Sequence, residues 1–251
     1  SYRLLDELDA ALERAVDDDG IRVIVLRGAG GNFSSGHDLG TPESIAYREE
    51  LGIPDDGIGW YEAFRYYNLD ITLRWRNLPK PTIAMVEGFC IFGGWMIAAA
   101  MDIIFAHKDA LFLPASPLEY ASVPWDIGVR KAKEICFEFR FLPASEAMEL
   151  GFANRVYDSI EELETETRNY ALRVAENSRA ALRMSKLVIN KAQDLQGFSN
   201  SMEGGLADYI VTSQQQATGR IEGVRRLGGV DMALRGLKGE RPGLTPPDAQ
   251  D

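Results

Sequence analysis

Apolar residues recur at helical spacing near the start of the chain. They are separated by acidic and basic residues, and the run ends in an acidic turn at residues 17–20. The members of the run are Leu4, Leu5, Leu8, Leu12 and Val16. This spacing places the apolar side chains on one face of a helix. The pattern therefore predicts an amphipathic helix that packs against the rest of the protein.

Short β-branched runs alternate with helical patterns in the part that follows. Residues 21–26 and 81–86 have the pattern of buried strands, and each run leads into glycines. A helix of small residues then extends to Ala100, and residues 103–106 have the pattern of a further strand. Parallel strands need helical crossovers between them, so this alternation predicts an α/β fold with a parallel sheet.

The remaining segments are aromatic or helical. Between residues 60 and 67 lies a dense group that forms either part of the core or the wall of a pocket: Trp60, Tyr61, Phe64, Tyr66 and Tyr67. From Gly128 onward helical patterns predominate, with candidate helices at 132–139, 145–150, 160–175 and 180–195. We expect a core over residues 1–176 and a helical C-terminal region over residues 177–251.

Composition and charge exclude several classes of protein. The chain has 251 residues, of which 45% are hydrophobic, and a formal net charge of -11. The negative charge disfavours nucleic acid and anionic membranes as partners. The longest uncharged stretch, residues 88–101, is shorter than the ~20 apolar residues of a membrane-spanning helix. Cys90 and Cys136 do not have the spacing of metal ligands, so we expect two buried thiols and no bound metal. We also expect a cytoplasmic protein.

The first glycine-rich loop, residues 28–39, follows a predicted strand directly. A dinucleotide-binding loop would need a third glycine where Phe33 stands, so the bulky ring argues against a nicotinamide enzyme. Polar side chains are contiguous after it: Ser34, Ser35, His37 and Asp38. Adjacent residues point apart and do not form a hydrolytic triad. The Asp38 carboxylate can instead bind local backbone N–H groups and fix the turn.

A second glycine element, Gly93-Gly94, precedes the helix of small residues. Paired glycines at a helix start expose backbone N–H groups and let a ligand approach the main chain closely. They serve close helix packing equally well. The pair alone therefore predicts either an anion-stabilising site or a packing contact.

Taken together, Phe33 to Leu39, Lys80 to Gly88 and Gly93-Gly94 resemble the signature of the crotonase (enoyl-CoA hydratase/isomerase) superfamily. The likeness continues through residues 102–106, 110–112, 128–134 and 147–156. It implies an α/β fold of the ClpP/crotonase type, a ββα-superhelix core with a C-terminal helical trimerisation region. Members of this family usually begin with a β-hairpin, so we expect that an N-terminal portion is missing here.

The resemblance also implies a ligand and an assembly. The substrate would be an acyl-coenzyme A thioester, with coenzyme A as part of the substrate and no separate cofactor. The assembly would be a homotrimer or a dimer of trimers, to which apolar residues such as Leu182, Leu187 and Ile189 would contribute. Some basic residues either meet the coenzyme A phosphates or lie on solvated helix faces: Arg130, Lys131, Lys133 and Lys186.

By position in the family signature, the thioester oxygen would lie between the backbone N–H groups of His37 and Gly93. Such a donor pair stabilises a developing enolate or tetrahedral oxyanion, at roughly 3 kcal/mol for one donor. The expected substrate-binding residues around this pair are Ser35, Gly36, Asp38, Leu39, Trp60, Phe64, Phe92, Met96, Ser116, Tyr120 and Trp125. If the aromatic group forms a pocket wall, a bulky or cyclic acyl group fits better than a short linear one.

Both acid–base positions of the family's hydratases depart from the pattern. Met96 and Ser116 stand where those enzymes carry glutamates. Hydration needs a general acid–base pair around a water, so simple hydratase activity is doubtful. Nearby carboxylates are Glu119 and Asp126, and relatives without the glutamates place an aspartate close to the position of Asp126. Asp126 is therefore a candidate acid, base or nucleophile, unless it caps a helix or is solvated.

The leading interpretation is a lyase, isomerase or hydrolase that acts on an acyl-CoA through an enolate or tetrahedral anion. Within the same superfamily, a decarboxylase or a C–C hydrolase would need neither hydratase glutamate. A catalytically silent binding or scaffold protein with the same fold is the alternative from another class.

Overall fold

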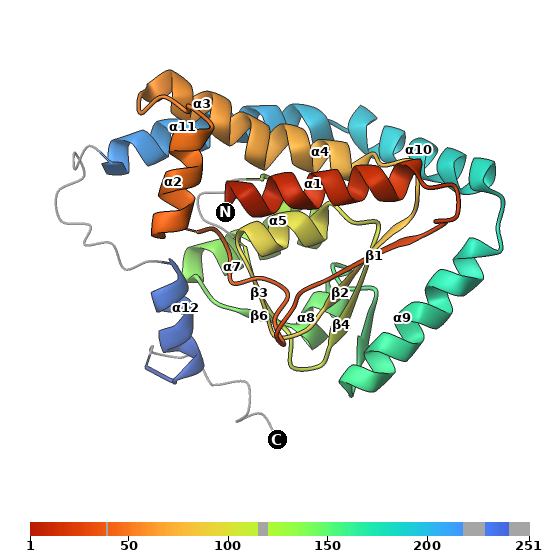
Figure 1. Ribbon diagram of the computed structural model, residues 1–251. Helices are drawn as coiled ribbons and strands as arrows, with labels where there is room; N and C mark the ends of the chain where they lie inside the picture. Colours follow the sequence, from red (N-terminus) through yellow and green to blue (C-terminus); the bar gives the residue numbers. More distant parts are fainter. Residues whose placement is uncertain (39, 115–119, 218–228, 241–251) are drawn as a thin grey trace.

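The β-branched runs pair as a parallel sheet, as their alternation with helices predicts. The computed structural model describes residues 1–38, 40–114, 120–217 and 229–240 (Figure 1). Its main sheet has four parallel strands in the order β1-β2-β4-β7. Their bounds are β1 (Ile24–Arg27), β2 (Thr82–Val86), β4 (Ile103–His107) and β7 (Arg155–Tyr157). The predicted parallel sheet is confirmed, although β1 begins later than residue 21.

The two faces of the main sheet are covered by different helices. Ile83 and Met85 of β2 pack with Leu163 in α9 (Ile160–Ala175). The alternate residues Ala84 and Val86 face a larger core. That core includes side chains from α1 (Tyr2–Asp17) and α5 (Gly93–Ala99). Burial on both faces explains why β2 is apolar from Ile83 to Val86.

A second, smaller sheet contains strands that the apolar pattern does not predict. It has the order β3-β5-β6, with β3 (Phe89–Ile91), β5 (Leu111–Leu113) and β6 (Leu142–Pro143). β3 pairs with β5 in parallel, and β5 pairs with β6 in antiparallel orientation. Strands of two or three residues are too short to show a period, and neighbouring chain segments determine where they form.

The aromatic segment is helical almost throughout. It contains α2 (Pro42–Glu50), α3 (Gly57–Phe64), the π-helix η1 (Arg65–Asp70) and α4 (Ile71–Arg76). Tyr67 is buried, whereas Trp60 and Phe64 are partly exposed and stack on each other with ring centroids 5.6 Å apart. The group is thus divided between the core and the surface of α3.

The C-terminal part is mainly helical, as predicted, and β6 and β7 are its short strands. Its further helices are α6 (Val123–Ile127), α7 (Val129–Glu138), α8 (Ala144–Glu149), α10 (Arg179–Leu195), α11 (Phe198–Ala217) and α12 (Gly229–Leu237). Figure 1 shows α10 and α11 running past the same side of the molecule as α3 and α4. No helix in the described ranges is long and apolar enough to cross a bilayer.

A partly buried ion pair attaches α10 to the main sheet. Lys186 is buried, and its Nζ lies 2.8 Å from Oδ2 of Asp102. The same oxygen accepts hydrogen bonds from the N–H and the hydroxyl of Thr82, at 2.8 and 3.0 Å. The prediction that Lys186 meets coenzyme A phosphates or lies on a solvated face is therefore wrong, because Asp102 and the sheet enclose its ammonium group.

Candidate active site

The two glycine-rich loops are joined by main-chain hydrogen bonds where β1 and β2 end. Ser34 forms an isolated parallel bridge with Cys90 of β3. The Ser34 N–H donates to the Phe89 carbonyl at 2.8 Å, and the Ile91 N–H donates to the Ser34 carbonyl at 3.0 Å. The Phe33 N–H donates to the Glu87 carbonyl at 2.8 Å. These bonds fix the loop that carries His37 against β3.

Gly88 lets these loops approach each other. Its φ is +57°, and a methyl group on its Cα would lie 2.3 Å from the Gly31 carbonyl oxygen. Beside it, the Phe89 N–H donates to Oδ1 of Asn32 at 2.9 Å. Only glycine fits both the positive φ and the close backbone contact.

The backbone turns sharply between β3 and α5. Phe92 has a φ of +47°, an uncommon conformation for a bulky residue and one found often at functional sites. Its N–H donates to the Leu113 carbonyl at 2.8 Å, and its carbonyl accepts from the Met96 N–H at 3.0 Å. Gly93 is the first residue of α5, so its N–H has no acceptor within the helix.

His37 packs directly on Gly93. A methyl group at Gly93 would lie 2.9 Å from Cε1 and 3.0 Å from Nε2 of the His37 ring. A methyl group at Gly94 would lie 2.8 Å from Cβ of Ser34. Both glycines therefore allow close packing of the two loops, and Gly93 is also placed as a backbone donor. The two functions proposed for the pair from the sequence are compatible.

The Asp38 carboxylate binds its own loop, as predicted. It accepts hydrogen bonds from the N–H of Gly40 at 3.1 Å and the N–H of Thr41 at 2.9 Å. The Thr41 hydroxyl donates a third at 2.7 Å. The bonds from Thr41, with that from Gly40, lower the pKa of Asp38 to about 2. Thr41 is in turn the N-cap of α2, so Asp38 fixes the start of that helix.

Asp126 lies in α6 and is bound to the helix that begins at Gly93. Its Oδ2 accepts hydrogen bonds from Nε1 of Trp95 at 2.9 Å and from the Ser122 hydroxyl at 2.7 Å. The residue is partly exposed, but its carboxyl group is enclosed by protein. Burial raises the pKa of Asp126 to about 7, although both hydrogen bonds act in the opposite direction. Such a carboxyl group can exchange a proton near neutral pH.

Trp95 is held in place by aromatic contacts. Its ring stacks on Phe152, with centroids 3.9 Å apart and an interplanar angle of 8°, and it meets Phe112 edge-on at 6.2 Å. Trp95 and Ser122 were not expected at the site from the sequence. A tryptophan directly after Gly93-Gly94 was the only signal available, and its partner lies thirty-one positions further along the chain.

The other expected substrate-binding residues are spread over several elements. Ser35 is exposed, and Gly36 has a φ of +98°. Trp125 donates from Nε1 to the Ser201 hydroxyl at 2.8 Å. Tyr120 is buried, and its hydroxyl has no hydrogen-bond partner among the described residues. Leu39, Ser116 and Glu119, which were also expected at the site, lie outside the described residues.

Both cysteines are free thiols with limited exposure. Cys90 is buried and Cys136 is partly buried, and burial raises the pKa of both thiols. In the described ranges no three His, Cys, Asp or Glu side chains lie close enough together to hold a metal ion.

The parallel sheet, the short second sheet and the paired glycine loops define a crotonase fold. The chain belongs to the enoyl-CoA hydratase/isomerase family, whose sequence model matches residues 1–222. A Mycobacterium tuberculosis relative named "Putative enoyl-CoA hydratase EchA13" is 37% identical over an alignment of 221 residues, and the match covers 80% of this chain and 69% of the relative.

Solved structures agree with this assignment. A probable enoyl-CoA hydratase from Mycobacterium smegmatis is 38% identical, with a TM-score of 0.77 over 89% of this chain and 88% of the other. A probable enoyl-CoA hydratase from Mycobacterium thermoresistibile is 37% identical, with a TM-score of 0.76 over 87% of this chain and 88% of the other.

Proposed function

We propose that the protein is an acyl-CoA enzyme that holds the thioester oxygen between the backbone N–H groups of His37 and Gly93. The observation that carries the proposal is the contact between the His37 ring and Cα of Gly93. It brings together two backbone segments that hydrogen bonds to β3 and to β5 already fix. Donors fixed in advance stabilise a developing oxyanion without reorganisation during the reaction.

Asp126 is the proposed acid–base residue. Trp95 and Ser122 both donate to Oδ2, which orients the carboxyl group and leaves Oδ1 for proton exchange. Trp95 lies two positions after Gly93 in α5, so its hydrogen bond ties the carboxylate of α6 to the helix that begins with the oxyanion donor. A pKa of about 7 keeps both protonation states populated near neutral pH.

Met96 favours chemistry other than simple hydration. Its buried thioether can neither give nor take a proton at the position of a family glutamate. Reactions that begin with loss of carbon dioxide, or with cleavage of a ring beside the thioester, need chiefly an anion-stabilising site and one proton carrier. We therefore favour a lyase or hydrolase acting on a bulky or cyclic acyl-CoA. The same residue also fits the alternative of a silent scaffold.

Assembly into a homotrimer, or a dimer of trimers, is part of the proposal. α10 exposes apolar side chains, among them Leu187 and Ile189, the latter 68% exposed. Exposed apolar surface on a helix commonly marks a protein interface. Leu182 of the same helix is partly buried and lines a hollow beside Pro79 and Lys80.

Calorimetry with matched ligands tests the oxyanion site. Acetyl-CoA should bind, free acetate should not, and the thioether S-ethyl-CoA should bind more weakly than acetyl-CoA because it lacks the carbonyl oxygen. Equal affinity for the thioester and the thioether would contradict the oxyanion role. Absence of binding by every coenzyme A ester at about 1 mM would remove the whole proposal.

A turnover panel then separates enzyme from scaffold. It comprises crotonyl-CoA hydration, decarboxylation of a malonyl-type thioester and hydrolysis of a cyclic ketoacyl-CoA. Turnover of any of these that is lost in Asp126→Asn supports the enzyme. Tight acyl-CoA binding without turnover on any of the three would favour the scaffold.

A further inference from the structure

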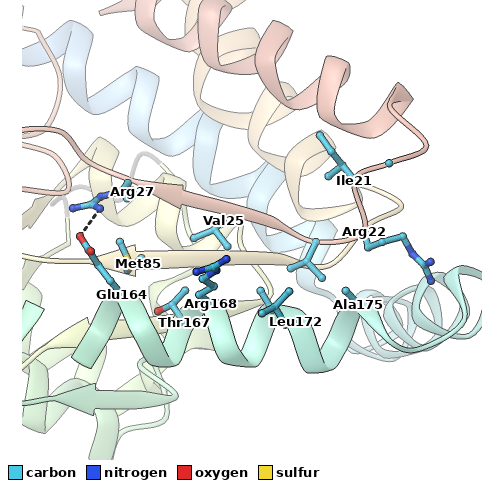
Figure 2. Close-up of a pocket in the computed structure, with 13 residues that line it drawn as sticks. Ile21, Arg22, Val25, Arg27, Met85, Glu164, Thr167, Arg168, Leu172 and Ala175 are labelled. Carbon is cyan, nitrogen blue, oxygen red and sulfur yellow. Dashed lines mark hydrogen bonds and ion pairs between the residues drawn. The ribbon is translucent and has the colours of Figure 1, made fainter. Parts of the chain in front are cut away.

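Several buried side-chain oxygens have no hydrogen-bond partner among the described residues. One is the hydroxyl of Thr167, which borders the hollow between β1 and α9 (Figure 2). That hollow lies at the free edge of the main sheet, where the expected N-terminal hairpin has room to pack. Another is the hydroxyl of Tyr120, which lies in the main core and is 4% exposed. A buried hydroxyl without a partner costs free energy, so its position needs an explanation.

Tyr120 belongs to the segment that leads into α6, the helix of Asp126. Its carbonyl accepts a hydrogen bond from the Ser122 N–H at 2.8 Å. The Ser122 hydroxyl in turn donates to Oδ2 of Asp126 at 2.7 Å. Burial raises the pKa of the Tyr120 phenol, and the charge of Asp126 raises it further. The phenol therefore lies within the electrostatic reach of Asp126 and remains protonated near neutral pH.

The ring of Tyr120 is held in place by α11. It meets Phe198 edge-on, with ring centroids 6.4 Å apart. Phe198 in turn lies beneath the guanidinium group of Arg76, at 4.4 Å from the ring centroid. A methyl group at Gly205 would lie 2.7 Å from Cβ of Ala121, so α11 packs closely on the residue after Tyr120. Packing alone thus fixes the ring, while its hydroxyl stays available for a ligand.

A stripe of polar side chains runs toward Tyr120 along η1 and α4. Asn68, Thr72 and Arg76 recur at a spacing of four residues, and all three are buried. Oδ1 of Asn68 and the hydroxyl of Thr72 have no hydrogen-bond partner within the described part of the chain. Arg76, which ends the stripe, acts electrostatically on Tyr120 and is neutralised by Asp194 at 3.2 Å. The stripe therefore presents uncharged polar atoms, and π-helical turns such as η1 are frequent at functional sites.

The proposed function places the acyl group beside Tyr120. A thioester oxygen at the Gly93 N–H and a reacting carbon within reach of Asp126 put that group between the start of α5 and α6. The hydrogen bond from Trp95 to Asp126 joins these two helices. Tyr120 comes two residues before Ser122, the N-cap of α6, and borders the same space. A substituent of the acyl group is then a partner for the buried phenol.

We infer that Tyr120 determines specificity, because its hydroxyl binds an uncharged oxygen, a hydroxyl or a ketone, on the acyl group. The inference rests on the proposed function and names its substrate class. The phenol gains a hydrogen bond when such a group binds, whereas an acyl group with only carbon there leaves it unpaired. A site built for a hydrogen bond rejects an analogue that lacks the group. The oxygen is uncharged because a carboxylate would be buried in the field of Asp126.

Calorimetry with matched thioesters and the full chain tests this selection. The probes are cyclohexanecarbonyl-CoA and its derivatives with a hydroxyl, ketone, carboxylate or methyl group at the third or fourth ring carbon. Substituents there are too far from the thioester to form a reactive β-keto thioester. At one of these positions the hydroxyl or keto derivative should bind at least tenfold more tightly than the methyl derivative.

Tyr120→Phe removes only the hydroxyl, so it should reduce this affinity ratio to about one while the unsubstituted ester binds as before. Tyr157→Phe is the matched control. The Tyr157 hydroxyl is also buried and has no hydrogen-bond partner among the described residues, but its ring packs on the α9 face of the main sheet. This variant should keep the wild-type ratio.

The outcomes separate this inference from the proposed function. If the unsubstituted ester binds but the wild type shows no preference for the hydroxyl or keto derivative, the inference is overturned and the proposed function stands; this comparison needs no variant. Retention of the preference by Tyr120→Phe, or tightest binding of the carboxylate derivative, would also overturn it. If no coenzyme A ester binds at about 1 mM, the proposed function fails and the inference fails with it.

Discussion

The stability of the Asp126→Asn variant relative to that of the wild type should increase as the pH rises. Burial raises the pKa of Asp126 from its ordinary 3.8 to about 7. Between about pH 4 and pH 7 the folded protein therefore retains a proton that the unfolded chain has lost. Wild-type stability consequently falls as the pH rises through this window. Asparagine cannot ionise, and its carbonyl oxygen can still accept from Trp95 and Ser122.

The size of the effect follows from the pKa. A rise from 3.8 to about 7 corresponds to a penalty of roughly 4 kcal/mol at pH 8, at about 1.4 kcal/mol for each tenfold change in ionisation. This value is an upper limit because part of the residue is exposed. At pH 4.5 the carboxyl group of the unfolded chain is already mostly ionised, so the stability of Asp126→Asn minus that of the wild type should increase by up to about 3 kcal/mol between pH 4.5 and pH 8.

Urea unfolding at fixed protein concentration, followed by fluorescence at pH 4.5, 6, 7 and 8, measures this difference. Asp38→Asn is the matched control. The pKa of Asp38 is lowered to about 2 by hydrogen bonds, so its contribution is lost only as the pH falls below its ordinary value. Its substitution should have a constant effect across this range. A pH-independent difference for Asp126→Asn would refute the reasoning about its burial.

Three further outcomes are expected. Gly93→Ala should lower turnover about 10²- to 10³-fold, because the added methyl group displaces the neighbouring imidazole of His37. The control Gly204→Ala should leave turnover unchanged, because a methyl group there meets nothing within 4 Å. Equal turnover by the two variants would contradict the donor role of Gly93. The wild type should hydrate crotonyl-CoA slowly, and the rate should rise more with Met96→Glu and Ser116→Glu together than with either substitution alone. Efficient hydration by the wild type would refute the view that the missing glutamates limit this reaction. Ile189→Glu should shift light scattering from an oligomer to a smaller species, and a monomeric wild type would contradict the proposed assembly.

The regular elements could be predicted because their patterns are long. The amphipathic period of α1 and the apolar run of β2 from Ile83 to Val86 indicate a helix and a buried strand directly. The strands β3, β5 and β6 are too short to show a period, and their positions depend on pairing with distant segments. The π-helix η1 has no pattern that distinguishes it from an α-helix.

The candidate site could be predicted only where it depends on the backbone. Glycines at the close contact with His37 are visible in the sequence, since a side chain at Gly93 would clash. The bond between Trp95 and Asp126 depends on how α5 and α6 pack, and the sequence shows neither that contact nor its effect on the pKa. Lys186 was misassigned for the same reason, because its partner Asp102 lies eighty-four positions earlier.

The ion pair of Lys186 and Asp102 joins two parts of the chain that are synthesised at different times. The strands β1, β2 and β4 leave the ribosome before α10, since β4 ends at His107 and α10 begins at Arg179. Asp102 already has its two hydrogen bonds from Thr82 within that first part of the chain. A sheet formed from that first part would carry the anionic partner before its cation is translated. A buried ammonium group away from this partner would be costly, so the ion pair favours the register of α10 in which Lys186 meets Asp102.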